Sequence, residues 1–162
     1  LAAAWRRWEA ITPAARAAPD LLFLNGISGL GSPYWRSHFE SRFVGDGDGG
    51  ARFAALVASI AYLVRENFNA LRGAGPIARA IVTGGLSQSN GLVQLIADLC
   101  GIPLLRPKDS EATARGVFGL LIRARAPAPP DGESQSFEPG ATMQADAGHR
   151  RWRDAMLQAL AS

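Results

Sequence analysis

The feature that most constrains the fold is a long amphipathic segment between two glycine-rich breaks. Apolar residues recur at helical spacing from Phe53 to Leu71, and this pattern predicts one helix with a buried face. The turn-forming run 45–50 precedes the segment, and the run 73–76 (Gly-Ala-Gly-Pro) ends it. An amphipathic helix must pack its apolar face against other elements, so the rest of the chain has to supply them.

Short apolar runs on both sides of this helix predict strands that alternate with further helices. Strands are expected over residues 20–24, 77–83 and 102–106. Further helices are expected over residues 1–11 and around Trp152. Another is expected to begin at a cap, Ser87 or Ser89, and to run to Cys100 with Gly101 at its end. A fourth is expected from a cap at Asp109 or Ser110 to Arg123. This alternation predicts an α/β layered fold. The Pro- and Gly-rich run 126–140 predicts a flexible linker or loop inside a single domain that spans residues 1–162.

Composition narrows the classes of protein and partner. The chain has 162 residues, which suits one domain, and it starts at Leu1 rather than Met, so we expect a piece of a longer polypeptide. No apolar run approaches the roughly 20 residues of a membrane span, so we expect no integral membrane protein. The basic residues are scattered arginines apart from Lys108 and a group around Trp152, whereas nucleic-acid binding requires basic residues on one face. The single Cys100 excludes internal disulfides and favours a cytoplasmic location.

The strongest local signal for a ligand runs from Ile81 to Asn90. A predicted strand ends there in Gly84 and Gly85, and a small polar loop opens the next helix. Glycines let a ligand approach the backbone closely, and helix N–H groups attract anions. An ordinary strand-to-helix turn explains the same pattern, so the glycine pair alone leaves both interpretations open.

The common catalytic and nucleotide motifs are absent from the sequence. The chain contains no Walker A loop and no G-x-G-x-x-G after a strand. The glycines around Ser28 and Ser87 do not form a G-x-S-x-G nucleophile elbow. His38 and His149 stand among polar residues, so we expect both to be solvated.

Several segments, in chain order, resemble the C-terminal domain of the FGGY carbohydrate kinases, and the glycerol kinases most closely. The matching segments are the loop 28–35 (Ser-Gly-Leu-Gly-Ser-Pro-Tyr-Trp), the run 43–45 with the helix that carries Ser-Ile-Ala-Tyr at 59–62, the loop and helix 82–94, the runs 97–107 and 111–116, and the run 137–139 with the helix around Trp152. The resemblance implies an actin-like, ribonuclease H-like ATPase domain, with a mixed sheet flanked by helices.

The resemblance also implies a function, which is the ATP-binding half of a carbohydrate or polyol kinase. Such an enzyme transfers the γ-phosphate of ATP, with Mg²⁺, to a hydroxyl of glycerol or a small sugar. By position, the implied nucleotide-binding residues are Gly84, Gly85, Leu86, Ser89 and Asn90, with Gly116 near the nucleotide pocket. Ser89 stands where the family has an adenine-contacting Asn.

The resemblance places the catalytic base and the substrate contacts in an N-terminal domain of the same polypeptide. We therefore expect no catalytic residue and no metal ligand in this chain, and no activity from the chain alone. The implied partners are that N-terminal domain and a small polyol or sugar, and a homo-oligomer is compatible with the sequence.

Two departures from the family pattern keep other functions open. Ala58 stands where the family has an acidic or amide residue, and the run 45–50 is shorter than its counterpart. A non-catalytic interaction module of the same fold and a kinase for xylulose or another pentulose are the alternatives.

Overall fold

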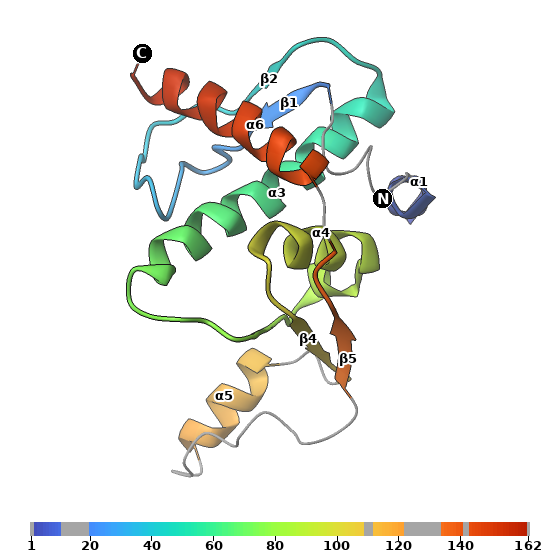
Figure 1. Ribbon diagram of the computed structural model, residues 1–162, viewed down its shortest axis with the longest axis vertical. Coiled ribbons are helices and arrows are strands. Elements are labelled where there is room, and N and C mark those ends of the chain that lie inside the picture. Colours follow the sequence, from blue (N-terminus) through green and yellow to red (C-terminus); the bar gives the residue numbers. More distant parts are fainter. Residues whose placement is uncertain (1, 11–19, 109–111, 122–133, 141–142, 162) are drawn as a thin grey trace.

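The computed structural model describes residues 2–10, 20–108, 112–121, 134–140 and 143–161 (Figure 1). Its helices are α1 (Ala2–Ala10), α3 (Gly49–Arg72), α4 (Asn90–Cys100), α5 (Ala112–Leu121), α6 (Met143–Ala161) and the short 3₁₀ helix η1 (Gly85–Gln88). Its strands are β1 (Leu22–Leu24), β2 (Arg42–Val44), β3 (Ala80–Ile81), β4 (Leu104–Pro107) and β5 (Ser134–Phe137).

The strands form two small sheets. β1 pairs with β2 in antiparallel register, Leu22 opposite Val44. In the second sheet β4 lies between its two neighbours, parallel to β3 and antiparallel to β5. The α/β class and the mixed sheet predicted above are therefore present in the described residues.

The core lies between the helices. Figure 1 shows α3 running between α6 on one side and α4 on the other, with β4 and β5 beyond α4. Tyr62, Trp152 and Met156 are fully buried there, and full burial of a side chain such as Met contributes about 1.5–3 kcal/mol. The Trp152 indole Nε1 donates a 2.9 Å hydrogen bond to the Phe23 carbonyl, which joins α6 to β1.

Helix ends follow the local sequence signals. Asp48 caps α3 by accepting a hydrogen bond from the Ala51 amide, and Ser89 caps α4 by accepting one from the Leu92 amide. α4 ends at Gly101, whose φ of 65° is left-handed and therefore favours glycine. The predicted Ser89 and Gly101 boundaries of α4 are confirmed.

Two sequence predictions need correction or restriction, and one strand has no counterpart among the predictions. The run 126–140, predicted as a linker, contains β5, because Ser134–Phe137 pairs with β4. Residues 126–133 of that run lie outside the described residues. The strand predicted over 77–83 is limited to Ala80–Ile81, and β2 was not predicted.

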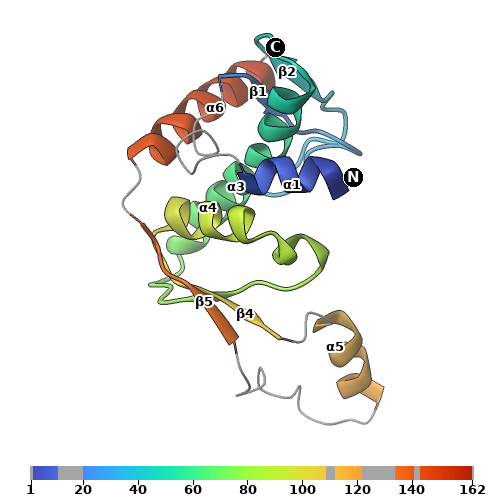
Figure 2. The same cartoon turned by 90° about the vertical axis from the view of Figure 1, so that its right-hand side faces the viewer.

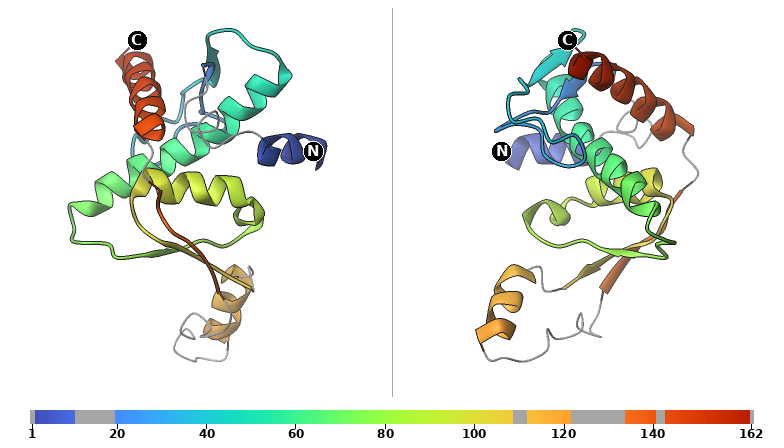
Figure 3. Two further views of the ribbon diagram at one scale, coloured as in Figure 1. Left: turned by 45° about the vertical axis from the view of Figure 1, so that its right-hand side comes forward. Right: turned by 90° about the vertical axis from the view of Figure 1, so that its left-hand side faces the viewer.

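α5 lies apart from the other helices. Both views of Figure 3 show it beyond β4 and β5, as does Figure 2. Its side chains Val117, Leu120 and Leu121 are exposed. None of the helices in the described ranges is long and apolar enough to cross a membrane.

Candidate functional site

The loop between β3 and α4 leaves its backbone open at two glycines. Gly84 has φ 86° and ψ 177°, a backbone conformation that residues other than glycine rarely adopt. A Cβ built on Gly84 or on Gly85 would meet no atom within 4 Å, so the space where a side chain would stand is open at both residues. The Ser87 hydroxyl donates a 2.7 Å hydrogen bond to the Gly84 carbonyl and closes the turn.

A cavity of about 840 Å³ opens beside this loop. It is lined by Arg6 and Glu9 of α1 and by Gly85, Leu86, Gln88 and Ser89. The Leu86 side chain is 48% exposed and gives the wall an apolar surface. Mostly apolar cavities with a few polar groups are typical of small-molecule sites.

The structure brings three of the five predicted nucleotide-binding residues to this cavity, namely Gly85, Leu86 and Ser89. Gly84 and Asn90 flank them in the chain but are not among the lining residues. Gly116 is exposed on α5 and is also not among them.

Ser89 is held by hydrogen bonds from both sides. Its Oγ donates to the Glu9 carboxylate at 2.5 Å and accepts from the Leu92 amide at 3.2 Å. The Gly91 amide donates to the same carboxylate at 3.0 Å. A hydroxyl has one proton and two lone pairs, so Ser89 retains the capacity to accept one further hydrogen bond.

Asn90 is exposed at the first position of α4. Its Oδ1 accepts a 2.7 Å hydrogen bond from Nη2 of Arg106. This contact fixes which way the amide points and leaves its nitrogen as a donor to a ligand.

Sequence reasoning missed the contribution of α1 to this site. Glu9 reaches Ser89 from 80 positions earlier in the chain, and no local pattern signals such a contact. Gln88 could have been found, because it lies inside the loop that the glycine pattern had already singled out.

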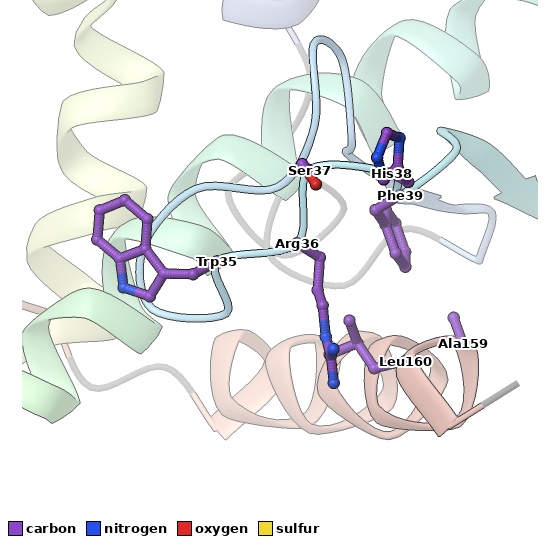
Figure 4. Close-up of a pocket in the computed structure, with 7 residues that line it drawn as sticks. All are labelled: Trp35, Arg36, Ser37, His38, Phe39, Ala159 and Leu160. Atoms are coloured by element: carbon purple, nitrogen blue, oxygen red, sulfur yellow. The ribbon is translucent and has the colours of Figure 1, made fainter.

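A second cavity, of about 420 Å³, lies between residues 35–39 and the end of α6 (Figure 4). Trp35 points away from the other labelled side chains, while Arg36 reaches toward Leu160. None of the predicted site residues lines this cavity.

A buried polar cluster ties α6 and the loop before β2 to α3. The Glu66 carboxylate accepts hydrogen bonds from the Tyr34 hydroxyl at 3.0 Å and from Nε2 of His149 at 2.8 Å, and Arg153 lies 3.5 Å away. Burial is the main cause that lowers the pKa of His149, while Glu66 opposes that shift. The prediction that His149 is solvated is wrong, because it is buried.

Two other kinds of chemistry find no support in the described part of the chain. Within it, no group of three or more His, Cys, Asp or Glu residues is placed to hold a metal ion. Burial raises the pKa of the Cys100 thiol to about 11, so this thiol is not a nucleophile at neutral pH.

Comparisons with known proteins identify the family. Residues 2–125 match the family model described as the C-terminal domain of the FGGY family of carbohydrate kinases. A glycerol kinase of Acaryochloris marina is 32% identical over 93% of this chain, and one of Aromatoleum aromaticum is 36% identical over 71%. The chain covers 33% and 25% of the lengths of these two relatives.

Solved structures show the same fold. A glycerol kinase of Plasmodium falciparum, solved with ADP, superimposes with a TM-score of 0.73 at 19% identity, covering 98% of this chain and 34% of that one. A ligand-bound xylulose kinase of Lactobacillus acidophilus gives a TM-score of 0.70 at 18% identity, covering 98% and 34%. The fold is thus the actin-like ATPase fold of these kinases. With the family match over residues 2–125, it follows that the chain belongs to the FGGY family of carbohydrate kinases, as a C-terminal domain.

Proposed function

We propose that this chain is the ATP-binding part of a carbohydrate or polyol kinase, which transfers the γ-phosphate of ATP to a hydroxyl of glycerol or a small sugar. The observation that carries the proposal is the cavity beside the open glycine loop, in a chain of this family. An N-terminal domain of the same polypeptide supplies the catalytic base and the acceptor contacts, as the resemblance implies.

The residues around the cavity fit an adenine nucleotide. Leu86 offers apolar surface to the purine ring, and the open face of Gly85 admits it closely. Ser89 can only accept a further hydrogen bond, which matches the 6-amino group of adenine. Asn90 flanks the cavity without lining it, and its amide nitrogen is a donor of the kind that a ring nitrogen of adenine accepts. These roles use the donor and acceptor capacity that the loop's own hydrogen bonds leave over.

Mg²⁺ enters this proposal without ligands from the described residues. When bound to the phosphates it offsets the charge that develops during transfer. Because the described residues offer no cluster to hold it, we assign no residue to the metal.

The acceptor is proposed from the relatives. The two curated relatives named above are glycerol kinases at 32% and 36% identity, so glycerol is the first acceptor to test. Xylulose is the second, because xylulose kinases share the fold. Measuring ADP release by the full-length protein with each acceptor separates the two. We also propose a cytoplasmic location, in keeping with the single buried Cys100.

The proposed nucleotide site is tested by filling the cavity. A Gly85→Trp substitution puts an indole where a Cβ meets no atom, so the protein should fold while the ring occupies the nucleotide's place. We expect ATP affinity, measured by calorimetry on the full-length protein, to fall at least about tenfold.

Gly31→Trp is the matched control. Gly31 is also exposed and its Cβ position is also open, but it does not line the cavity. Gly31→Trp should bind ATP like the wild type. Equal ATP affinity in Gly85→Trp and the wild type would show that ATP does not bind in this cavity.

A further inference from the structure

Arg106 connects the glycine loop to the mixed sheet. It lies on β4, and its guanidinium donates to three acceptors on three other elements. Nη1 donates to the Ser87 carbonyl of η1 at 2.5 Å, and Nη2 donates to Asn90 Oδ1 of α4 at 2.7 Å and to Gln135 Oε1 of β5. All three acceptors are uncharged, so toward these described residues the guanidinium serves as a multiple hydrogen-bond donor.

The sheet fixes where this guanidinium lies. Arg106 is directly opposite Gln135 in the antiparallel β4–β5 register. Its Cζ lies 5.0 Å from the centroid of the buried Phe137 ring. A planar guanidinium that stacks on a ring and donates in several directions is pre-organised for such a role, which a lysine cannot reproduce.

The bonds inside the loop do not set its position. The Ser87 and Ser89 amides donate back to the Gly84 and Leu86 carbonyls at 3.1 and 3.2 Å. These short-range bonds fix the shape of η1 but not its place relative to β4. Arg106 supplies that link through Ser87, and Glu9 of α1 makes a separate contact with Ser89.

We infer that Arg106 is a positioning residue for nucleotide binding, which holds η1 so that Gly85 and Leu86 form the cavity wall. This inference rests on the proposed function. Arg106 does not line that cavity, so its effect passes through Ser87 and Asn90. A small displacement of a binding wall is costly, because contacts depend steeply on position.

The test compares Arg106→Gln with Arg72→Gln in the full-length protein. Arg72 is a matched arginine, the last residue of α3, and it contacts the C-terminal end of α4. Its Nη2 donates to the Cys100 carbonyl at 3.1 Å and its Cζ lies 4.9 Å from the Phe68 ring centroid. Both substitutions remove a guanidinium that donates to a backbone carbonyl and lies over an aromatic ring. Only Arg106→Gln removes a hydrogen bond to the loop between β3 and α4.

Three quantities are measured: the Kd for ATP, the KM for ATP and for the acceptor, and the unfolding midpoint without nucleotide. For Arg106→Gln we expect the Kd and KM for ATP to rise about tenfold, while the acceptor KM stays unchanged. For Arg72→Gln we expect the wild-type KM for ATP. A purely structural role of Arg106 would lower the unfolding midpoint without separating the two KM values.

The outcomes are distinguishable. If the wild type binds no ATP, the proposed function fails and the inference fails with it. If the wild type binds ATP and Arg106→Gln matches Arg72→Gln, the function stands and the positioning role is overturned. If Arg106→Gln does not fold, the ATP affinity of Arg106→Lys is measured in its place. An ATP affinity between those of wild type and a non-binding protein supports the role, and wild-type affinity overturns it.

Discussion

Glu66 accepts hydrogen bonds from two residues that are far from it in the sequence, Tyr34 and His149. The two side chains are 83 positions apart and only 2.8 Å from each other. The neighbours of His149 in the sequence are polar, so local patterning favours exposure. The burial of His149 follows from packing on Tyr62 and Trp152, which no window around residue 149 reveals.

Stability should fall as the pH is lowered below the ordinary histidine value. Burial lowers the pKa of His149 from 6.5, so just below that pH the unfolded chain binds a proton that the folded chain does not. Protonation of His149 in the unfolded chain then favours unfolding. The free energy of unfolding decreases further with falling pH until the folded-state pKa is reached. Glu66 faces the ring, and Arg65 and Arg153 lie near enough to oppose its protonation.

The measurement is the urea midpoint between about pH 7 and about pH 5. His149→Gln should show a smaller decrease than the wild type, because it cannot take up this proton. His38→Gln, at an exposed histidine, should keep the wild-type pH dependence. Identical pH dependence in the wild type and His149→Gln would contradict the argument.

At the scale of elements, the ends of α4 and the strands β1 and β4 can be predicted from local sequence, whereas β2 and β5 cannot. The caps at Ser89 and Gly101 are local chemical signals, so α4 could be placed from its own residues. β5 forms only because β4 offers a partner, and its Ser-Gln-Ser-Phe sequence follows a Pro-rich run typical of loops. β2 is exposed at all three positions and so lacks an alternating pattern.

The same reasoning applies to the candidate site. Gly85, Leu86 and Ser89 belong to one short segment, so the resemblance of that segment to the family pattern predicts them together. Arg6, Glu9 and Arg106 belong to other elements, and only the packing of α1 and β4 against the loop brings them there.

The cap of α4 should affect both stability and binding. Ser89→Ala removes the acceptor for the Leu92 amide and should cost about 1 kcal/mol in the free energy of unfolding. Asp48→Ala removes the corresponding cap of α3 at a similar cost. Calorimetry should find weaker ATP binding in Ser89→Ala alone. Unchanged ATP affinity in Ser89→Ala would exclude a direct role for its hydroxyl.

At the scale of the whole molecule, we expect the chain to provide one wall of the proposed site. Glu9 is the one carboxylate among the residues that line the described cavity, and it already accepts hydrogen bonds from Ser89 and Gly91. A kinase needs a carboxylate aimed at the attacking hydroxyl. The chain spans a quarter to a third of the two curated relatives named above, so that group is expected elsewhere.

We therefore expect the 162-residue chain to show no ATP-dependent phosphorylation when produced alone. A coupled ADP assay with glycerol and with xylulose checks this, and the full-length protein in the same assay is the positive control. Phosphorylation of either compound by the short chain would show that the catalytic carboxylate lies within it.

The hydrogen bond from Trp152 to Phe23 joins residues 129 positions apart, and it has a consequence for synthesis. The ribosome synthesises β1 and α3 before it has made α6. The face that α6 covers is therefore exposed to solvent for most of translation. The α3–α4 pair can form on the nascent chain, whereas the packing of β1 against Trp152 must wait. Until then Tyr62, which packs on Trp152, offers an apolar surface of the kind that chaperones bind.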